Sequence, residues 1–235
     1  MSEPPARLPF TVRGRRRGRR LRPGRLLLLE TLLPRLAIDL PPPGARLDPM
    51  RLFARPPCDV WLEIGFGAGE HLAWQAHRHP EIGFVGCEVF VNGVAGLLDQ
   101  VARLGLENVR VFADDARGLI EALPDASLGR VFLLFPDPWP KARHWQRRFI
   151  GGDNLGRLAR VLKDGAELRV ATDDPGYQRW TLDHALRHPD FRWPARRPGD
   201  WRDRPPDWPP TRYEQKALAA GRRPVFLRFE RRPRA

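Results

Sequence analysis

Residues 59–69 are Asp-Val-Trp-Leu-Glu-Ile-Gly-Phe-Gly-Ala-Gly, and this stretch decides the fold. Its apolar first half predicts a strand over 59–64, and the amphipathic residues 70–78 that follow predict a helix. Between them, Gly65, Gly67 and Gly69 allow a sharp turn and let a ligand approach the backbone without an intervening Cβ. The spacing G-x-G-x-G differs from the G-x-G-x-x-G of dinucleotide sites, so by itself it is a weak sign of a ligand.

The same alternation of strand and helix continues along the rest of the chain. Further strands are predicted at 83–88, 109–113, 130–135, 167–172 and 225–229. Further helices are predicted at 92–104, 116–123, 154–162 and 176–187, and the Pro- and Trp-rich stretch 192–210 predicts an irregular ordered loop. Strands that alternate with helices predict a parallel sheet covered on both faces. The expected fold class is therefore α/β, with a doubly wound, mostly parallel sheet.

The composition limits the class of protein. The chain has 235 residues, enough for one large domain with an appendage, and no run of about 18 apolar residues that could span a membrane. Its two cysteines, Cys58 and Cys87, are too few for a disulfide scaffold or a cysteine zinc site, and they predict a cytoplasmic protein. His71 and His77 have the wrong spacing for a metal pair on a helix, so no metal is expected.

Positive charge is concentrated near the N-terminus. The net charge of +13 and the sequence pI of about 11.2 predict a polyanionic partner, by default a nucleic acid. Nine arginines and no acid lie within residues 4–29, so we expect a flexible phosphate-binding arm, with Arg13, Arg15 and Arg16 among its RNA contacts. A removable leader is the alternative. With a helix possible from residue 26 and a proline linker at 41–44, arm and linker are expected at 1–44 and the main domain at 45–235.

Acidic side chains surround the glycine turn in this otherwise basic protein. Residues 58–77 contain Asp59, Glu63 and Glu70 and neither Lys nor Arg. Such a charge would repel a pyrophosphate and attract a cationic ligand, such as the ammonium and sulfonium groups of S-adenosylmethionine.

Two more acids follow the next two predicted strands. Glu88 stands where doubly wound folds place a carboxylate that accepts hydrogen bonds from ribose hydroxyls. Asp115 follows the third strand and could accept the adenine amino group, although Asp114 or Asp115 could instead cap the next helix. Together with the glycine turn, acids at three successive strand ends favour S-adenosylmethionine as the cofactor.

The fourth predicted strand continues into Phe-Pro-Asp-Pro-Trp-Pro-Lys-Ala-Arg-His-Trp-Gln-Arg-Arg at residues 135–148. Prolines on both sides of Asp137 fix the backbone there, which makes Asp137 the candidate catalytic residue, next to the expected methyl group. Trp139 offers a flat face for a base or packs at the strand end, and the basic residues behind it could hold phosphates.

These motifs resemble those of the bacterial tRNA (guanine-N7)-methyltransferases, which have the Rossmann-like class I methyltransferase fold. The resemblance rests on Glu63–Gly67, on Phe135–Arg148 and on Thr-Arg-Tyr-Glu at 211–214, and it extends from about residue 11 to residue 230. It implies methylation of N7 of guanosine 46 in the tRNA variable loop, giving 7-methylguanosine.

The resemblance also assigns roles to individual residues. It implies contacts to the methyl donor from Glu63, Glu88, Asp115 and Asp137, and contacts to the substrate from Lys141, Asp173, Thr211, Arg212, Tyr213 and Glu214. It implies RNA contacts from Arg143, His144, Trp145, Gln146, Arg147 and Arg148, with Gln146 standing where a basic residue is frequent.

The chemistry of these residues leaves some alternatives open. Guanine N7 already presents a lone pair, so orientation and electrostatics should supply most of the catalysis. Asp137 and Asp173 could stabilise the positive charge that forms on the ring, or one of these carboxylates or Glu214 could hold the N1–H and amino edge. An exocyclic-amine RNA methyltransferase and a noncatalytic arginine-rich RNA-binding protein are the rival functions. A monomer and a homodimer are equally compatible with the sequence.

Overall fold

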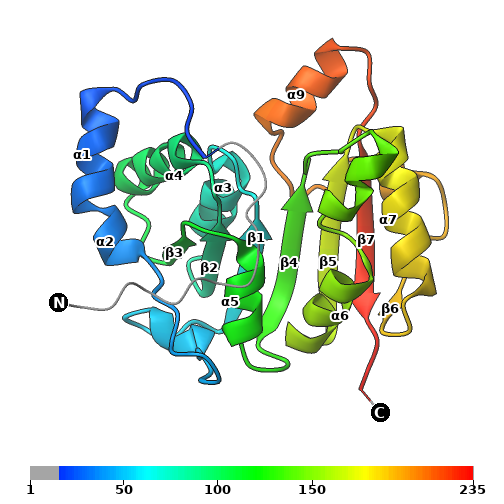
Figure 1. The fold of residues 1–235 in the computed structure, drawn as a ribbon, viewed down its shortest axis with the longest axis horizontal. Coiled ribbons are helices and arrows are strands. Elements are labelled where there is room, and N and C mark those ends of the chain that lie inside the picture. Colours follow the sequence, from blue (N-terminus) through cyan, green and yellow to red (C-terminus); the bar gives the residue numbers. More distant parts are fainter. Residues whose placement is uncertain (1–15, 235) are drawn as a thin grey trace.

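One seven-stranded sheet organises the computed structural model, which describes residues 16–234. Its strands are β1 (Asp59–Ile64), β2 (Ile82–Cys87), β3 (Val109–Phe112), β4 (Leu128–Leu134), β5 (Leu162–Thr172), β6 (Phe191–Arg192) and β7 (Val225–Arg231). The order is β3-β2-β1-β4-β5-β7-β6, with the first five strands parallel and β7 antiparallel to both of its neighbours. The expected doubly wound, mostly parallel α/β fold is confirmed (Figure 1).

Helices cover both faces of this sheet. Those before β4 are α1 (Pro23–Thr31), α2 (Leu33–Leu36), η1 (Pro49–Leu52), α3 (Glu70–Arg78), α4 (Val91–Leu104) and α5 (Ala116–Ala122). Those after β4 are η2 (Ala142–Arg147), α6 (Gly152–Val161), α7 (Pro175–Arg187), α8 (Gly199–Arg202) and α9 (Arg212–Ala219). The helices α3 and α4 share one hydrophobic cluster, whereas α5, α6 and α7 share another. None of the described helices is long and apolar enough to cross a bilayer.

The alternation of side chains along the strands explains the two clusters. On β1, Val60, Leu62 and Ile64 belong to the cluster of α5, α6 and α7, while Trp61 packs on the opposite face. On that opposite face Trp208 joins Phe132 of β4 and Phe226 of β7 in a third, smaller cluster. Because both faces are buried, the strands have the nearly continuous apolar runs that the sequence shows.

The sheet places two sequence motifs side by side. The strand order reverses between β1 and β4, and ligands of such sheets bind at the carboxyl ends of the strands at this point. The glycine turn 65–69 follows β1, and the loop 135–148 follows β4. The two motifs therefore start from adjacent strand ends.

The described part of the basic segment packs against the domain. Helix α1 contacts α4, and Leu28 and Leu29 lie against the cluster of α3 and α4. Leu36 is buried, and Ala37 forms a parallel bridge to Val111 at the β3 edge of the sheet. The expectation that residues 4–29 form a flexible arm is therefore wrong for residues 23–29, because Leu28 and Leu29 pack against the domain while Leu26 and Leu27 stay exposed. The division at residue 44 stays a prediction, and residues 1–15 lie outside the described range.

Candidate active site

The glycine turn has the backbone conformation for which glycine is suited. Gly65, Gly67 and Gly69 have φ angles of +72°, +58° and +79°, in the left-handed region that side chains disfavour. A Cβ on Gly65 would meet no atom within 4 Å, whereas one on Gly69 would collide with Leu97 of α4. The turn is therefore open at Gly65 and closely packed at Gly69.

A glycine that sequence reasoning missed completes this packing. Gly93 lies in the first turn of α4, and a Cβ there would come within 2.3 Å of the carbonyl oxygen of Gly67. Helix α4 can therefore approach the glycine turn only because position 93 has no side chain. The sequence signal was the Asn-Gly pair at 92–93 inside a predicted helix, where glycine is unfavourable without a packing reason.

Glu88 connects the glycine turn to the start of α4. Its carboxylate accepts hydrogen bonds from the backbone N–H of Gly67 (2.9 Å) and of Phe90 (2.9 Å). Burial raises the pKa of Glu88, the backbone hydrogen bonds oppose this, and the charge of Asp137 raises it further. Because the charge of Asp137 acts on Glu88, the acid after β2 and the acid after β4 belong to one site.

Glu63 and Asp115 have protein partners in the structure. Glu63 is buried, and its Oε2 lies 2.7 Å from Nδ1 of His71 on α3. Asp115 caps α5 by accepting from the N–H of Arg117 (3.0 Å) and forms an ion pair with the Arg117 guanidinium (2.6 Å). The helix-cap alternative is thus what the structure shows for Asp115. Contacts of both acids with a methyl donor stay predictions.

The pair of Glu63 and His71 belongs to a buried polar network that sequence reasoning missed. Gln75 Nε2 lies 3.2 Å from His71 Nε2 and donates to the backbone carbonyl of Asp207 (2.7 Å). The carboxylate of Asp207 accepts from Arg169 of β5 (2.6 Å). The network joins the end of β1 to the segment that precedes α9. His71 and Gln75 are one turn apart on α3, but only the tertiary fold brings Asp207 and Arg169 to them, so no local pattern could have indicated the whole network.

The loop after β4 has an unusual backbone. Phe135 and Trp139 both have positive φ angles, +50° and +42°, which bulky side chains rarely adopt. Asp137 lies between them and is exposed. Within residues 16–234, no hydrogen bond or ion pair engages its carboxylate. The loop therefore presents an exposed carboxylate near Glu88 that has no partner among residues 16–234.

Arg148 lies on the inner side of the loop, and its expected contact with RNA stays a prediction. Its side chain is only 7% exposed, and its Nε donates to the carbonyl of Pro138 (2.8 Å). Longer contacts of 3.5 Å join its terminal nitrogens to the carbonyls of Trp139 and Gly176. Burial lowers the pKa of Arg148. Through these contacts with backbone carbonyls, Arg148 holds the loop in place from its inner side.

The rest of the basic run forms the outer surface of this loop. Lys141, Arg143 and Gln146 are exposed, and so is the indole of Trp145. The guanidinium of Arg147 lies 4.9 Å from the ring centre of Trp139, and His144 meets the same ring edge-on. These placements are compatible with the expected RNA contacts, which stay predictions.

The motif at 211–214 forms the start of α9, which the strand and helix patterns did not predict. Thr211 caps the helix by accepting from the N–H of Glu214 (3.2 Å). Tyr213 lies over the site: its ring stacks on Phe135 and lies 3.0 Å from where a Cβ on Gly67 would be. Arg212 lies 3.8 Å from Glu70.

Two of the acids expected to hold guanine are paired with arginines outside the predicted set. Glu214 is buried and accepts from Arg204 (3.3 Å). Asp173 accepts from the Nε of Arg222 (2.6 Å). Among the three acids considered for the guanine, only Asp137 lacks an ion pair within the described residues.

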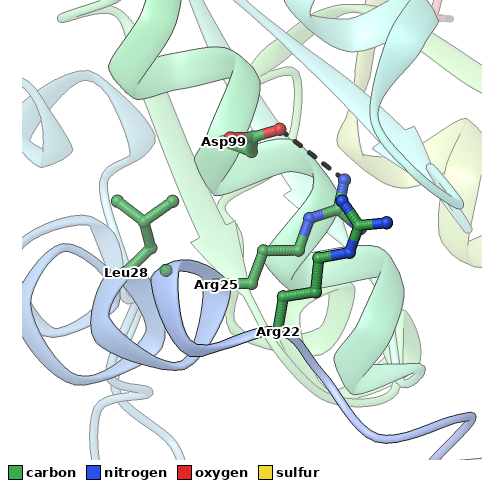
Figure 2. A pocket seen from close by; sticks show the side chains of 5 residues that line it. Arg22, Arg25, Leu28 and Asp99 are labelled. Atoms are coloured by element: carbon green, nitrogen blue, oxygen red, sulfur yellow. Dashed lines mark ion pairs between the residues drawn. The ribbon is translucent and has the colours of Figure 1, made fainter.

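The basic segment lies beside the site. Arg16 pairs with Asp114 (3.2 Å), and the Asn92 side chain bonds to the backbone of Gly18 (2.7 Å) and Arg19 (2.7 Å). Further along, α1 and α4 enclose a hollow of about 700 Å³. It is lined by Arg22, Gly24, Arg25, Leu28 and Asp99 (Figure 2). The predicted contacts at Arg13 and Arg15 lie outside the described residues.

The assembled site has the chemistry that a cationic methyl donor requires. Its glycine turn leaves open space at Gly65, and Glu88 and Asp137 supply negative charge for a sulfonium and acceptors for hydroxyl groups. Across residues 16–234, no group of three or more His, Cys, Asp or Glu side chains is placed to hold a metal ion. The burial of Cys87 next to Asp115 and Glu88 raises the pKa of its thiol, which keeps it neutral.

Comparisons with known proteins agree with this geometry. The model of a family described as "Putative methyltransferase" matches residues 58–227. The tRNA (guanine-N(7)-)-methyltransferase of Rhodospirillum rubrum is 56% identical over 224 residues, covering 94% of this chain and 88% of the relative. The protein of the same name from Paramagnetospirillum magneticum is 54% identical over 222 residues, covering 94% and 92%.

Solved structures show the fold alone. TrmN from Thermus thermophilus gives a TM-score of 0.52 at 17% identity, covering 74% of this chain and 44% of that one. The 16S rRNA methyltransferase KamB gives a TM-score of 0.51 at 17% identity, covering 75% and 89%.

Proposed function

Because the chain belongs to the family of tRNA (guanine-N(7)-)-methyltransferases, we propose that it transfers a methyl group from S-adenosylmethionine to N7 of guanosine 46 in the variable loop of tRNA. The product is 7-methylguanosine. The observation that supports the proposal is the exposed carboxylate of Asp137, near Glu88 and the glycine turn, on a loop whose outer surface is basic. Since tRNA is the substrate, we place the reaction in the cytoplasm.

When bound, S-adenosylmethionine supplies an electrophilic methyl group on a sulfonium. Transfer of this group would form the N7–methyl bond as the sulfur–methyl bond broke, with S-adenosylhomocysteine as the leaving product. The positive charge passes to the guanine ring, so no residue has to remove a proton from N7. The protein must hold the two reactants in line and stabilise the charge.

The residues divide this work between them. Glu88 lies where it can accept hydrogen bonds from the ribose hydroxyls of the methyl donor, and Asp137 faces the developing positive charge. Asp173 and Glu214 are neutralised by Arg222 and Arg204, which suits them to hold the guanine edge rather than to supply net negative charge. Tyr213 covers the glycine turn from α9.

The N7 edge of guanine lies in the deep groove of an RNA helix, where a side chain cannot reach it. The target must therefore lie in a loop or leave its stack. This requirement matches an exposed loop of 135–148 with aromatic and basic side chains on its outer surface.

One experiment tests both the reaction and the position of the methylated guanosine in tRNA. Unmodified tRNA is incubated with the protein and S-adenosylmethionine labelled in its methyl group, and the RNA is then digested to nucleosides. We expect label in 7-methylguanosine, and borohydride followed by aniline should cleave the chain at position 46. Label in an N2- or N6-methylated nucleoside would favour the exocyclic-amine rival. Failure to bind S-adenosylmethionine in calorimetry would favour a noncatalytic RNA-binding protein.

A further inference from the structure

A second hollow, separate from the glycine turn, lies between the loop 135–148 and helix α7. Its volume is about 570 Å³, within the range of sites that hold small ligands. It is lined by Pro140, Trp145, Arg148, Asp174, Gly176, Arg179, Trp180 and Asp183. Of these residues, Pro140, Trp145 and Arg148 belong to the loop motif considered above, and none of the eight is assigned a contact with the reacting atoms in the proposed methyl transfer.

The hollow has an aromatic wall. The rings of Trp145 and Trp180 lie 5.6 Å apart at 55°, and Trp180 is fixed by a hydrogen bond from its Nε1 to the carbonyl of Ile150 (2.5 Å). Trp145 keeps 41% of its surface exposed. The two rings are tilted, so no slot lies between them, but the free face of Trp145 can receive a planar group. Aromatic faces of this kind stack on bases of any sequence.

The hollow also has charges of both signs. Arg148 is buried, yet within residues 16–234 no carboxylate lies within ion-pair distance of its guanidinium. Arg179 is exposed and likewise has no ion pair there. On the acidic side, Asp174 caps α7 and Asp183 pairs with Arg187 (2.7 Å). Backbone carbonyls accept from this guanidinium and Asp174 stabilises its charge from beyond ion-pair distance, so an anionic ligand group would add the direct charge partner that Arg148 lacks within residues 16–234.

We propose that this hollow binds one unpaired nucleotide of the tRNA, directly next to the target guanosine. The base stacks on Trp145, the phosphate meets Arg179 and the charge of Arg148, and Asp174 or Asp183 accepts from N–H groups on the base. An apolar ligand would give no direct charge partner to Arg148 or Arg179, which have no ion pair within residues 16–234. A nucleotide matches the aromatic wall and both signs of charge at once.

The loop itself explains why the neighbour of the target should bind here. Asp137 stands at its start and Trp145 and Arg148 at its end, and Arg148 joins the two parts by bonding to the carbonyl of Pro138. One rigid loop thus separates the methyl-transfer site from the hollow. Holding a flanking nucleotide on its far side would keep the target guanosine out of its stack. This inference rests on the proposed function only for the identity of the RNA.

The test is a cycle that combines changes in the RNA and in the protein. Binding is measured with tRNA transcripts that lack the base immediately 5′ or 3′ of the target guanosine, using the full chain and its Trp145→Ala variant. For the unaltered protein, one of the two abasic positions should weaken binding about tenfold, the amount expected for one stacked base. With Trp145→Ala the same abasic change should have almost no effect. Equal weakening in both proteins, or none in either, would overturn the proposal.

A second pair of variants tests the phosphate contact. Arg179→Ala should weaken tRNA binding severalfold and lower the salt dependence by about one contact. Arg55→Ala removes the same charge at an exposed position that precedes β1, at the amino end of that strand, and should do neither. If the two variants behave alike, the hollow holds no phosphate and the proposal fails.

These binding measurements need no methyl donor, so they are independent of the reaction. Formation of 7-methylguanosine without coupling between Trp145 and a flanking base would leave the proposed function intact and reject the hollow as a nucleotide site. Coupling between Trp145 and a flanking base without formation of 7-methylguanosine would support the hollow as a nucleotide site and reject the proposed function.

Discussion

Tyr213 of α9 stacks on Phe135 at the end of β4, with ring centres 6.5 Å apart and planes at 18°. The same tyrosine lies against Gly67, so its ring joins three segments that are far apart in the sequence: the glycine turn, the loop after β4 and the C-terminal helix. Phe135 has a positive φ angle, and the stack helps to hold it in this unfavourable conformation. The C-terminal segment is therefore part of the candidate site.

Replacing Tyr213 tests this arrangement. Tyr213→Ala removes a stack worth about 0.5–1.5 kcal/mol and uncovers the glycine turn, so affinity for S-adenosylmethionine should fall by roughly threefold to tenfold. Tyr213→Phe keeps the ring and should keep the affinity. Calorimetry with both variants makes the comparison. An equal loss in both would assign the effect to the hydroxyl group instead of the stack.

Binding of the methyl donor should depend on pH through Glu88. Burial raises the pKa of Glu88, so its carboxylate becomes protonated at a higher pH than an exposed glutamate. Affinity for S-adenosylmethionine should therefore fall as the pH is lowered toward that pKa, and calorimetry between pH 5 and pH 8 would measure the fall. Glu88→Ala should bind more weakly by roughly 1.5–3 kcal/mol at neutral pH, with a flatter pH profile and nearly unchanged tRNA affinity. A variant with unaltered affinity would remove Glu88 from the site.

The same pKa has the opposite effect on folding. Glu88 has a higher pKa in the folded chain than in the unfolded chain, so folding takes up protons at this residue. Its contribution to the free energy of unfolding is complete below the unfolded pKa and is lost as the pH rises through the folded pKa. Stability and methyl-donor affinity thus favour opposite charge states of Glu88, which is typical of a residue placed for binding.

Gly93 allows a test of the contact between α4 and the glycine turn. A Cβ at this position would meet the Gly67 carbonyl, so Gly93→Ala should destabilise the protein by about 1–3 kcal/mol and weaken methyl-donor binding. Gly156→Ala is the matched control: it also lies inside a helix, but its Cβ would meet only His188, at 3.9 Å, and it should stabilise by about 0.5–1 kcal/mol. Chemical denaturation measures both. Stabilisation by Gly93→Ala would show that the backbone can shift.

The sequence predicted most of the fold because the sheet is buried on both faces. Apolar runs mark β1 to β5 and β7, and each predicted helix between them is present with ends shifted by two residues at most. The two-residue strand β6 has too few residues for any periodicity. Helix α9 begins with Thr211 as cap, but its amphipathic pattern is short and follows a proline-rich stretch, so the pattern alone does not predict a helix there. The packing of α1 was not predicted because the many arginines before it indicate a flexible segment, whereas its apolar run is only four leucines long.

The candidate site was predictable where it depends on strand ends. Glycine positions, Glu88 and Asp137 follow from where the chain leaves the sheet, so their placement near one another was expected. The partners of the acids were not expected: Arg222 reaches Asp173 from a distant segment, and no motif marks His71 as the partner of Glu63 or Arg204 as the partner of Glu214. Arg148 shows the same limit, because nothing in a run of arginines tells which one turns inward.

Asn92 should determine how the basic segment contributes to RNA binding. Its side chain holds the backbone of Gly18 and Arg19, so Asn92→Ala should release the neighbouring arginines and weaken tRNA binding severalfold. Deleting residues 1–21, which leaves α1 intact, should weaken binding more and lower the salt slope by roughly 0.7–0.9 for each lost phosphate contact. Filter binding at several salt concentrations measures the tRNA affinity of the Asn92→Ala variant and of the deletion. If the deletion leaves the slope unchanged, these arginines contact no phosphate.

The last prediction concerns the chemical step. Asp137→Asn keeps the shape of the side chain and removes its charge, so tRNA and methyl-donor binding should persist while turnover falls about 10²–10³-fold, the loss typical of one preorganised electrostatic contact. Single-turnover methylation with saturating tRNA measures the step directly. Asp173→Asn is the informative comparison, because Asp173 is already neutralised by Arg222 and its charge should matter less to the transition state. If Asp137→Asn retained full turnover while Asp173→Asn did not, the charge that stabilises the methylated ring would come from Asp173, and Asp137 would serve only to shape the loop between its two prolines.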